Sequence, residues 1–564
     1  MWRRTYLLLL CVRIYFAFCP SYLHPDEIFQ GPEVIAGSVL GFPSRKTWEW
    51  TSDQPIRSVF PLWPAYGIPM VLLKWLWPHE EYETVDTAVV YYTLRFVMFI
   101  LSFVLEDWAI HELVHSPRYR RQAVVLVASS YVTWTYQTHT FSNSIETLIV
   151  LWSLVLIERI AKADNASLAS SFVLAFLLVF GTFNRITFPA FVLIPGIILL
   201  PQFWNRPFCF FALLFSGAFW TFIAIATDTA YYRPGADASY RALFKSIATS
   251  PVVTPLNNVL YNTRTENLAE HGLHPHYQHL LANLPQLLGP ALVVLISQCY
   301  PFSRATIKSV LVNPRLSSAT TSILILSIVP HQESRFLLPI VPLLLTCLKL
   351  PSSSILKATF WISWLAFNAS LAVLMGTYHQ GGIIPAQIAL PGLISRELNS
   401  TGSDATNIEV FWWKTYPPPT YLIGHPPPLH AASKSPLNIS TVPLMGIPQS
   451  ELLFMLMQHV PTCDPSLIER ITSHTQSTEV FVAAPLAAWR LPNDEYPDPA
   501  EFGFRVDFDA PKATLGLRNV QTWRQHVNLD DMDFGDDGVL PTLRRVVGRR
   551  GLGVWRVERV CDVR

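Results

Sequence analysis

The N-terminal stretch "MWRRTYLLLLCVRIYFAFCPSYLHPDEIFQGPEV" (residues 1–34) joins an apolar segment to a pair of acids. Residues 5–20 are apolar enough to form a membrane helix. Because no small-residue cleavage site follows and many apolar segments come later, we expect this segment to stay as the first membrane span. Arg3 and Arg4 place the N-terminus in the cytosol, so Asp26 and Glu27 should lie on the other side of the membrane.

The composition supports a polytopic membrane protein. Of the 564 residues, 51% are hydrophobic and 14% are charged, whereas soluble domains have about 25% charged residues. The formal net charge of +1 gives no general attraction for nucleic acid. The seven cysteines have no paired spacing, which argues against a zinc site and a disulfide framework.

Apolar segments of roughly the length of a membrane helix recur along the first two thirds of the chain. We predict about eleven spans, at residues 5–20, 88–106, 123–137, 144–160, 169–183, 187–203, 208–226, 283–299, 316–330, 336–350 and 357–376. Residues 57–77 are also apolar but contain three prolines. The basic cluster at 116–121 should be cytosolic, which requires one crossing between residues 21 and 116. We therefore expect residues 57–77 to be juxtamembrane or re-entrant, within one long first loop at 21–87.

The same alternation places the chemically dense stretches on one side of the membrane. These are "HPDE" (24–27), "HTFSNSIE" (139–146), "FNR" (183–185), "TDTAYY" (227–232) and "HQESRF" (331–336), all on the non-cytosolic face. Residues 1–376 thus form a predicted transmembrane domain. Residues 377–564 are less apolar and predict a small mixed α/β domain on the same face, with strands in "STEVFVAAPLAAWRL" and "GVWRVERV" and possible glycosylation at Asn399 and Asn438.

Asp26 and Glu27 are the first candidates for chemistry. A carboxylate beside a bilayer must pair, face water or act as a base, and its usual pKa near 4 keeps it ionised at neutral pH. The alternative is that Asp26 caps a helix that starts at Glu27. The two roles are compatible, since the start of a rigid helix is a good place to hold a base.

Charged side chains at the ends of other apolar segments are further candidates. Arg335, with His331 and Glu333 beside it, suits a phosphate because guanidinium binds phosphate oxygens in pairs; a structural ion pair at the membrane interface is the alternative. Arg185 and Glu146 lie in or beside apolar runs, where they either bind substrate or pair with one another. Asp228 lies at the far-side end of another span. The histidines of the loop before residue 283 have no spacing typical of a metal site.

Several stretches resemble one known family. They are "HPDEIFQGPEVIAG", "TWEWTSDQPIRSVFPL", "THTFSNSIETLIV", "FGTFNRITFPAFVLIP", "NNVLYNTRTENLAEHGLHPHY", "HQESRFLLPI", "YHQGGIIPA" and "VFWWKTYPPPTYLIG". Together they resemble glycosyltransferase family 22, mannosyltransferases of the endoplasmic reticulum that use dolichyl-phosphate-mannose and have the GT-C fold. The "NLAEHGLHP" and "HQGG" stretches favour the branch that adds the fourth mannose to the glycosylphosphatidylinositol (GPI) anchor precursor.

The resemblance implies a metal-independent, cofactor-free transfer of an α-1,2-linked mannose with inversion, at the luminal face. Asp26 is then the expected base, Glu27 an orienting partner, and Arg335 and His331 contacts of the donor phosphate. His24, Arg57, Glu146, Arg185, Asp228 and Glu333 complete the expected substrate-binding set. Alternatives are transfer of the third GPI mannose or of an N-glycan mannose, and less closely a lipid flippase or a membrane scaffold. The implied partners are the donor lipid, the GPI precursor and the endoplasmic reticulum membrane; protein partners stay unknown.

Overall fold

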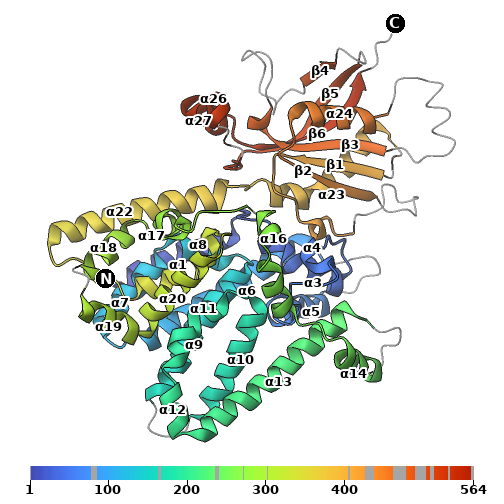
Figure 1. Cartoon of the computed structure of the whole chain (residues 1–564). Helices are drawn as coiled ribbons and strands as arrows, with labels where there is room; N and C mark the ends of the chain where they lie inside the picture. Colours follow the sequence, from blue (N-terminus) through green and yellow to red (C-terminus); the bar gives the residue numbers. More distant parts are fainter. Residues whose placement is uncertain are drawn as a thin grey trace.

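The computed structural model describes residues 2–77, 85–162, 167–234, 240–270, 272–300, 303–403, 405, 407–425, 437–461, 478–489, 504–508, 513–530, 532 and 534–560. A bundle of helices forms one end of the molecule and a β-sheet stands on the other (Figure 1). The longer bundle helices are α1 (Trp2–Phe18), α6 (Thr87–Leu113), α7 (Pro117–Ala128), α9 (Ser142–Lys162), α10 (Leu168–Asn184), α11 (Phe188–Ile197), α13 (Pro207–Tyr232), α18 (Pro290–Cys299), α20 (Pro314–Ile328) and α22 (Ser354–Val373).

Three helices in the described part of the chain are long and apolar enough to cross a membrane by themselves: Thr87–Leu113, Pro207–Tyr232 and Ser354–Tyr378. Most other predicted spans coincide with shorter or broken helices, so the number of crossings stays a prediction. The expected span 283–299 is wrong as a single straight helix. Its two halves meet at an angle of 118°, because Gly289 between them takes a positive φ of 47° that ends the first half.

The predicted span 336–350 is also not a continuous helix. A 3₁₀ turn, η4 (Ser334–Leu337), is followed by the six-residue helix α21 (Ile340–Leu345). Pro339 and Pro342 lie in this segment, and each removes a backbone N–H that a longer helix would need. The segment is nevertheless buried within the bundle, where Leu338, Ile340 and Leu343 have no exposed surface.

The first loop folds into short helices against this bundle. They are α2 (Asp26–Phe29), α3 (Pro32–Leu40), α4 (Trp48–Thr51), the π-helix η1 (Trp63–Gly67) and α5 (Ile68–Leu76). With nine residues, α5 is too short to cross a bilayer, which needs about 20 residues. The apolar stretch 57–77 therefore fits the juxtamembrane or re-entrant interpretation.

The C-terminal part contains a mixed six-stranded sheet in the order β2-β1-β3-β6-β5-β4. The strands are β1 (Asn407–Trp413), β2 (Asn438–Met445), β3 (Thr478–Pro485), β4 (Phe504–Phe508), β5 (Ala513–Trp523) and β6 (Leu552–Val560). Strand β1 is parallel to β2 and β3, and the other pairs are antiparallel. Helices α24 (Gln449–His459) and α27 (Val539–Gly548) accompany the sheet. The mixed α/β prediction and its two named strands, β3 and β6, are confirmed.

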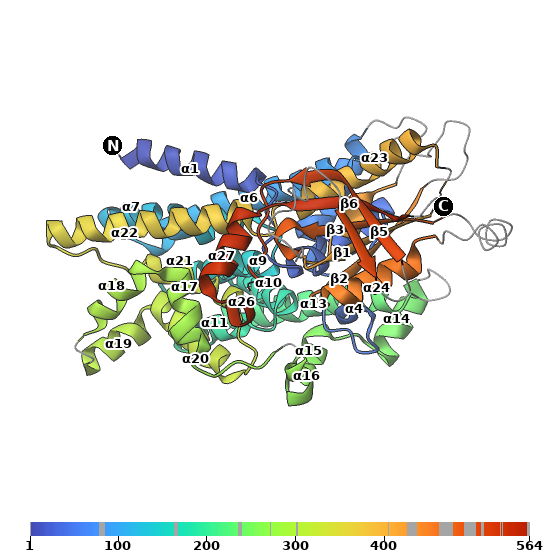
Figure 2. The same ribbon diagram turned by 90° about the horizontal axis from the view of Figure 1, so that it is seen from above.

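The C-terminal part of the chain packs against the first loop. Seen from above, it covers the side of the bundle that carries α4 and leaves the far end of α22 uncovered (Figure 2). The segment after β1 makes the contact: Tyr22 donates a hydrogen bond to Pro417 O at 3.0 Å, and Thr87 donates one to Leu422 O at 2.9 Å. Helix α23 (Ile383–Thr401) and residues of β1 share one hydrophobic core with the bundle.

Candidate active site

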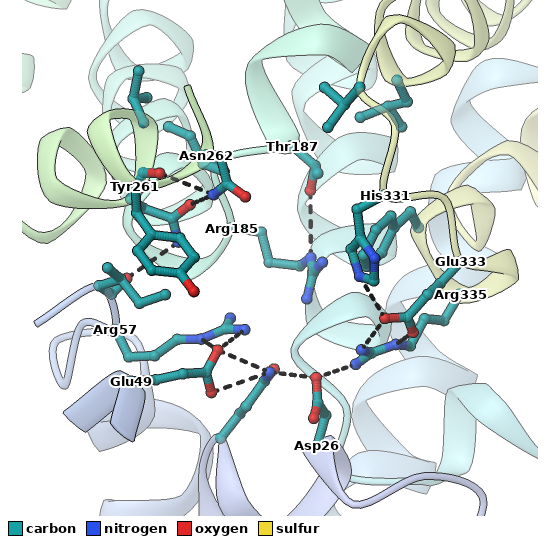
Figure 3. Close-up of a pocket in the computed structure, with 18 of the residues that line it drawn as sticks. Asp26, Glu49, Arg57, Arg185, Thr187, Tyr261, Asn262, His331, Glu333 and Arg335 are labelled. Atoms are coloured by element: carbon teal, nitrogen blue, oxygen red, sulfur yellow. Dashed lines mark hydrogen bonds and ion pairs between the residues drawn. The ribbon is translucent and has the colours of Figure 1, made fainter. Parts of the chain in front are cut away.

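A cavity of about 780 Å³ lies where the first loop meets the bundle. Its walls come from the first loop, the start of α11, helix α15 (Thr254–Asn262), the end of α20 and the η4 turn. Seven of the ten residues predicted for the site line it: His24, Asp26, Arg57, Arg185, His331, Glu333 and Arg335. The charge pattern assigned all seven to one face of the membrane, and Figure 3 shows six of them, Asp26, Arg57, Arg185, His331, Glu333 and Arg335, around the cavity.

Asp26 lies at the floor of the cavity and does not cap a helix. Asp26 is the first residue of α2, Pro25 occupies the cap position, and no side chain caps the helix. The Asp26 carboxylate instead accepts hydrogen bonds from the Arg335 guanidinium and the Gln30 amide. Nδ1 of His24 is 3.5 Å from its other oxygen. The helix-cap interpretation is therefore wrong, because the side chain turns into the cavity.

Arg335 joins Asp26 to a second carboxylate. Its Nε and NH2 groups bind the two oxygens of Glu333, while NH1 binds Asp26. Glu333 Oε1 also accepts a bond of 2.9 Å from His331 Nε2, and the other ring nitrogen of His331 lies 3.3 Å from Gly272 O. Both ring nitrogens of His331 thus face oxygen acceptors, which favours the doubly protonated imidazolium.

The hydrogen-bonded chain continues along the floor to a second ion pair. Gln30 Nε2, which binds Asp26, is also 3.4 Å from Glu49 Oε2. Glu49 Oε1 accepts two bonds from Arg57, at 2.9 Å from Nε and 2.7 Å from NH2. We call the set Asp26, Gln30, Glu49, Arg57, Glu333 and Arg335 the cavity floor. Its ion pairs hold each member in a fixed place before any ligand binds.

Ionisation in the cavity floor follows from these contacts. Burial by itself would raise the pKa of Asp26, but the positive charges of Arg335, His24 and Arg57 outweigh it and hold the pKa well below its usual range. The pKa of Glu333 is lowered in the same way, since Arg335 and His331 outweigh its burial. Glu333 also raises the pKa of His331 against the effect of burial. At neutral pH the two carboxylates are therefore ionised and the floor carries opposite charges side by side.

Arg185 lies on the wall above the floor and is held by several contacts. It is the residue after α10, and its NH1 donates to Ser142 Oγ at 3.0 Å. Its Nε is 3.3 Å from Glu146 Oε2, so the predicted pairing of these two residues is confirmed. The guanidinium carbons of Arg185 and Arg335 lie 5.2 and 5.5 Å from the centre of the same Phe336 ring. Two cations therefore lie close to one aromatic ring of the cavity lining.

Three of the predicted site residues do not line the cavity. Glu27 points into the protein, where its carboxylate lies 2.6 Å from His139 Nδ1. Glu146 is buried behind Arg185 and accepts a bond of 2.5 Å from Thr187. Asp228 binds the backbone N–H of Val59 at 2.9 Å and so fixes the first loop from behind. The cavity lining therefore does not include them, and an orienting role of Glu27 and substrate contacts of Glu146 and Asp228 stay predictions that this lining does not support.

The other residues of the cavity were not named individually by sequence analysis. Gln30, Glu49 and Thr187 lie on its floor and wall, and Trp48, Tyr261 and Asn262 form another side. All belong to or adjoin the stretches that carry the family resemblance. A single polar or aromatic residue in a loop gives no signal of its own, so only the folded positions identify them.

The sequence matches the model of the Alg9-like mannosyltransferase family over residues 4–425. The chain belongs to this family. It is 51% identical to GPI mannosyltransferase 4 of Emericella nidulans, with 99% of this chain and 98% of that protein covered. It is 50% identical to GPI mannosyltransferase 4 of Aspergillus oryzae, with 99% of each covered. ArnT from Cupriavidus metallidurans bound to undecaprenyl phosphate has a TM-score of 0.45 and 11% identity, covering 85% of this chain and 92% of that chain.

The match to the Alg9-like mannosyltransferase family includes every wall of the cavity and the segment after β1 that packs on the first loop. It ends before β2, so most of the sheet lies outside it. Among the described residues, no group of three or more His, Cys, Asp or Glu side chains is placed to hold a metal ion. A metal-independent reaction stays a prediction.

Proposed function

We propose that this chain transfers a mannose from dolichyl-phosphate-mannose to the third mannose of the GPI precursor, forming an α-1,2 linkage with inversion. The proposal rests on the family membership and on relatives that are called GPI mannosyltransferase 4. The observation that carries the chemistry is the cavity, where Asp26 and Arg335 on the floor and Arg185 on the wall lie beside an apolar wall.

The reaction needs a base, an in-line approach and a stabilised leaving group. The 2-hydroxyl oxygen of the acceptor mannose forms a bond to C1 of the donor mannose. The bond from C1 to the phosphate oxygen breaks, and its electron pair leaves with dolichyl phosphate. The hydroxyl proton passes to the base. Because attack comes from the side opposite the leaving phosphate, the β-linked donor gives an α-linked product.

Asp26 is the proposed base. Its carboxylate is ionised and lines the cavity, whereas Glu27 does not reach it. Arg335 lowers the pKa of Asp26, which by itself would make Asp26 a weak proton acceptor. A bound donor phosphate would also interact with the Arg335 guanidinium. The negative phosphate would offset part of the positive charge that lowers the pKa of Asp26. Donor binding would therefore raise the pKa of Asp26 before the proton is transferred.

Arg335 and Arg185 are the proposed donor-phosphate contacts. Three of the five N–H groups of Arg335 are engaged by Glu333 and Asp26, which leaves two donors for phosphate oxygens. The Arg185 guanidinium carbon lies 5.2 Å from the centre of the Phe336 ring, which Arg335 also approaches. The charge that builds up on the departing phosphate would then lie near two fixed cations, which is the geometry that lowers a barrier of this kind.

The lipid part of the donor fits the apolar wall formed by α11 and α20. Ile186, Leu193, Ile325 and Val329 line this wall, and Leu193 and Val329 are partly exposed beyond it. A polyprenyl chain can follow these side chains into the bilayer while its phosphate reaches Arg185 and Arg335. This placement requires the GT-C arrangement that the family resemblance implies, with the active site on the luminal face of the endoplasmic reticulum membrane.

Lipid profiling of cells that lack this protein tests the proposal. We expect a GPI intermediate with three mannoses to accumulate, and expression of the intact chain to remove it. Accumulation of an intermediate with two mannoses, or of a truncated N-glycan precursor, would assign the chain to another acceptor. If the GPI precursor and the N-glycan precursor were both mannosylated normally, but a lipid were distributed differently between the two leaflets of the membrane, the result would instead support a flippase.

A further inference from the structure

The cavity has a second side that the proposed chemistry does not use. It is lined by Trp48 at the start of α4 and by residues of α15 and its end, namely Asn258, Tyr261, Asn262 and Thr263. Figure 3 shows the Tyr261 and Asn262 side chains extending into the cavity across from His331, Glu333 and Arg335. We call this set the aromatic–amide side.

Trp48 and Tyr261 form a stacked aromatic pair. Their ring centres are 4.7 Å apart and the ring planes differ by 30°. Trp48 keeps 40% of its surface exposed although it lines a cavity. An aromatic surface of this kind offers an apolar face, and sugars have a matching face of C–H groups with hydroxyls around the rim.

The amides beside this pair suit hydroxyl groups. Asn262 Nδ2 is held by Asn258, at 2.6 Å from its Oδ1 and 2.9 Å from its backbone oxygen. The Thr263 hydroxyl and the Glu49–Arg57 pair adjoin them on the cavity wall. Amides and hydroxyls both donate and accept hydrogen bonds, as a sugar hydroxyl requires. Glu49 and Arg57 in this region form an ion pair and so neutralise each other.

The two halves of the aromatic–amide side are fixed to one another. Asn257 and Asn258 of α15 donate hydrogen bonds to the backbone oxygens of Pro55 and Ile56 in the first loop, at 3.0 and 3.3 Å. Thr254 at the start of α15 donates to Asp228 at 2.8 Å, and Asp228 also holds Ser58. The aromatic pair is therefore built before a ligand arrives, which reduces the entropy lost on binding.

The two sides of the cavity suit different parts of a two-substrate reaction. The donor brings a charged phosphate and a long apolar chain, and these match Arg185, Arg335 and the α11–α20 wall. The acceptor brings a neutral chain of mannose units, which matches stacked rings and amides. Glu49, which follows Trp48 in the chain, is joined to Asp26 through hydrogen bonds of Gln30. A sugar held by the aromatic–amide side would present its next unit to the base.

We infer that Trp48, Tyr261 and Asn262 form the acceptor subsite, which binds the mannose units preceding the one that is extended. This inference rests on the proposed function and adds to it the place where the neutral oligosaccharide is recognised. Trp48 and Tyr261 are binding residues in this assignment, and they take no part in proton transfer.

Steady-state kinetics with the full-length protein in detergent tests the assignment. The probes are dolichyl-phosphate-mannose and a GPI-precursor glycolipid with three mannoses, each varied at a saturating level of the other. For Trp48→Ala and Tyr261→Ala we expect the acceptor KM to rise about 10-fold, with the donor KM within about twofold of the unchanged protein. Tyr261→Phe keeps the ring and should keep the acceptor KM.

Trp75→Ala is the matched control, because Trp75 is 75% exposed on α5 and does not line the cavity. Should Trp48→Ala fail to accumulate, Trp48→Phe and Asn262→Ala replace it, with the larger rise in acceptor KM expected for Asn262→Ala. A rise in the donor KM, or an unchanged acceptor KM in well-folded Tyr261→Ala, would overturn the subsite. Absence of transfer to the three-mannose lipid by the unchanged protein would overturn the proposed function instead.

Discussion

The cavity floor and the buried side of the first loop both contain carboxylates, and they differ in what lies beside them. On the floor, Asp26 and Glu333 share Arg335. On the buried side, Glu27 meets His139 at 2.6 Å, and Glu33 accepts backbone N–H groups from Arg45 and Tyr421. Asp26 and Glu27 are adjacent in the chain, yet they belong to different regions.

This difference sets their ionisation. Arginine lowers the pKa of the floor carboxylates despite their burial. Burial raises the pKa of Glu27 to about 8, because the charge of Arg95 and one backbone hydrogen bond compensate only part of the desolvation. It raises the pKa of Glu33 to about 7, because the hydrogen bonds that Glu33 accepts also compensate only part of it. The floor carboxylates are therefore ionised at neutral pH, whereas Glu27 is mostly protonated and Glu33 is protonated in about half of the molecules. The ionised carboxylates of the cavity floor are suited to catalysis, and the carboxyl groups of the buried side are suited to structural support.

The largest expected effect is that of Asp26→Asn. The amide keeps the size of the side chain but cannot take a proton, so we expect mannosyl transfer in microsomes to fall by about 10² to 10⁴-fold at normal protein abundance. Asp53→Asn, at an exposed position of the same loop, is the control and should retain activity. Substantial transfer by Asp26→Asn would exclude Asp26 as the base.

Arg335→Lys should have the next largest effect. Lysine keeps the charge but cannot bind both oxygens of Glu333 while it also reaches Asp26. We expect kcat/KM for the donor to fall by about 10 to 100-fold, measured with donor varied at saturating acceptor. Arg121→Lys, an exposed change on α7, should leave it unchanged. An unaltered donor kcat/KM in Arg335→Lys would show that only charge matters at this position.

The variants Glu27→Gln and Glu27→Ala distinguish a structural role of Glu27 from a role in proton transfer. Glutamine resembles the protonated carboxyl that burial favours, so Glu27→Gln should keep most of the transfer activity. Alanine leaves the buried His139 without this partner and should lower the free energy of unfolding by about 1–3 kcal/mol. Thermal unfolding in detergent, read beside the transfer assay, measures both. Loss of activity in a stable Glu27→Gln protein would make Glu27 the base.

The pH dependence of stability should come from the buried side. A carboxyl whose pKa is higher in the folded than in the unfolded protein makes stability fall as pH rises between the two values. For Glu27 this window runs from its ordinary value of 4.5 to about 8. We expect the unfolding midpoint to fall between pH 5 and pH 8, and Glu27→Gln to reduce that slope.

Glu333 provides the contrasting variant for this pH experiment. Its pKa is lowered on folding, so its contribution to stability is present above the ordinary value of 4.5 and is lost only as pH falls below it. Because Glu333 also raises the pKa of His331, the comparison is made in a His331→Gln background, where adding Glu333→Gln should leave the slope between pH 5 and pH 8 unchanged. If the unfolding midpoint changed with pH equally in Glu27→Gln and in the unchanged protein, the proposed difference in ionisation between the cavity floor and the buried side would be contradicted.

The smallest effect is expected for Tyr416→Phe in the segment after β1. The Tyr416 ring lies 6.0 Å from His24, and its hydroxyl is 3.3 Å from His379 Nε2. Phenylalanine keeps the ring against His24, so kcat should change less than about threefold. Tyr416→Ala removes that support and should lower kcat more than it raises either KM. Identical kcat values for Tyr416→Phe and Tyr416→Ala would show that the segment after β1 does not position His24.

Much of this arrangement was accessible from sequence because charge and apolarity act locally. The Arg335 and Asp26 motifs lie at the ends of apolar stretches, where an unpaired charge is energetically costly and so indicates a function. Both residues line the cavity. The same reasoning failed for Asp228 and Glu146. A buried acid that binds backbone N–H groups or a neighbouring arginine looks identical in sequence to one that faces a substrate.

The sequence by itself determined the membrane character and the family, since each depends on composition or motif identity, and its charge order predicted the side on which the motifs gather. Only the tertiary structure decided that Asp26 faces the cavity while Glu27 faces His139, because α2 turns successive side chains in different directions. It also brought Trp48 beside Tyr261, more than two hundred positions later in the chain. Contacts over such separations depend on the packing of the whole bundle, which no local pattern encodes.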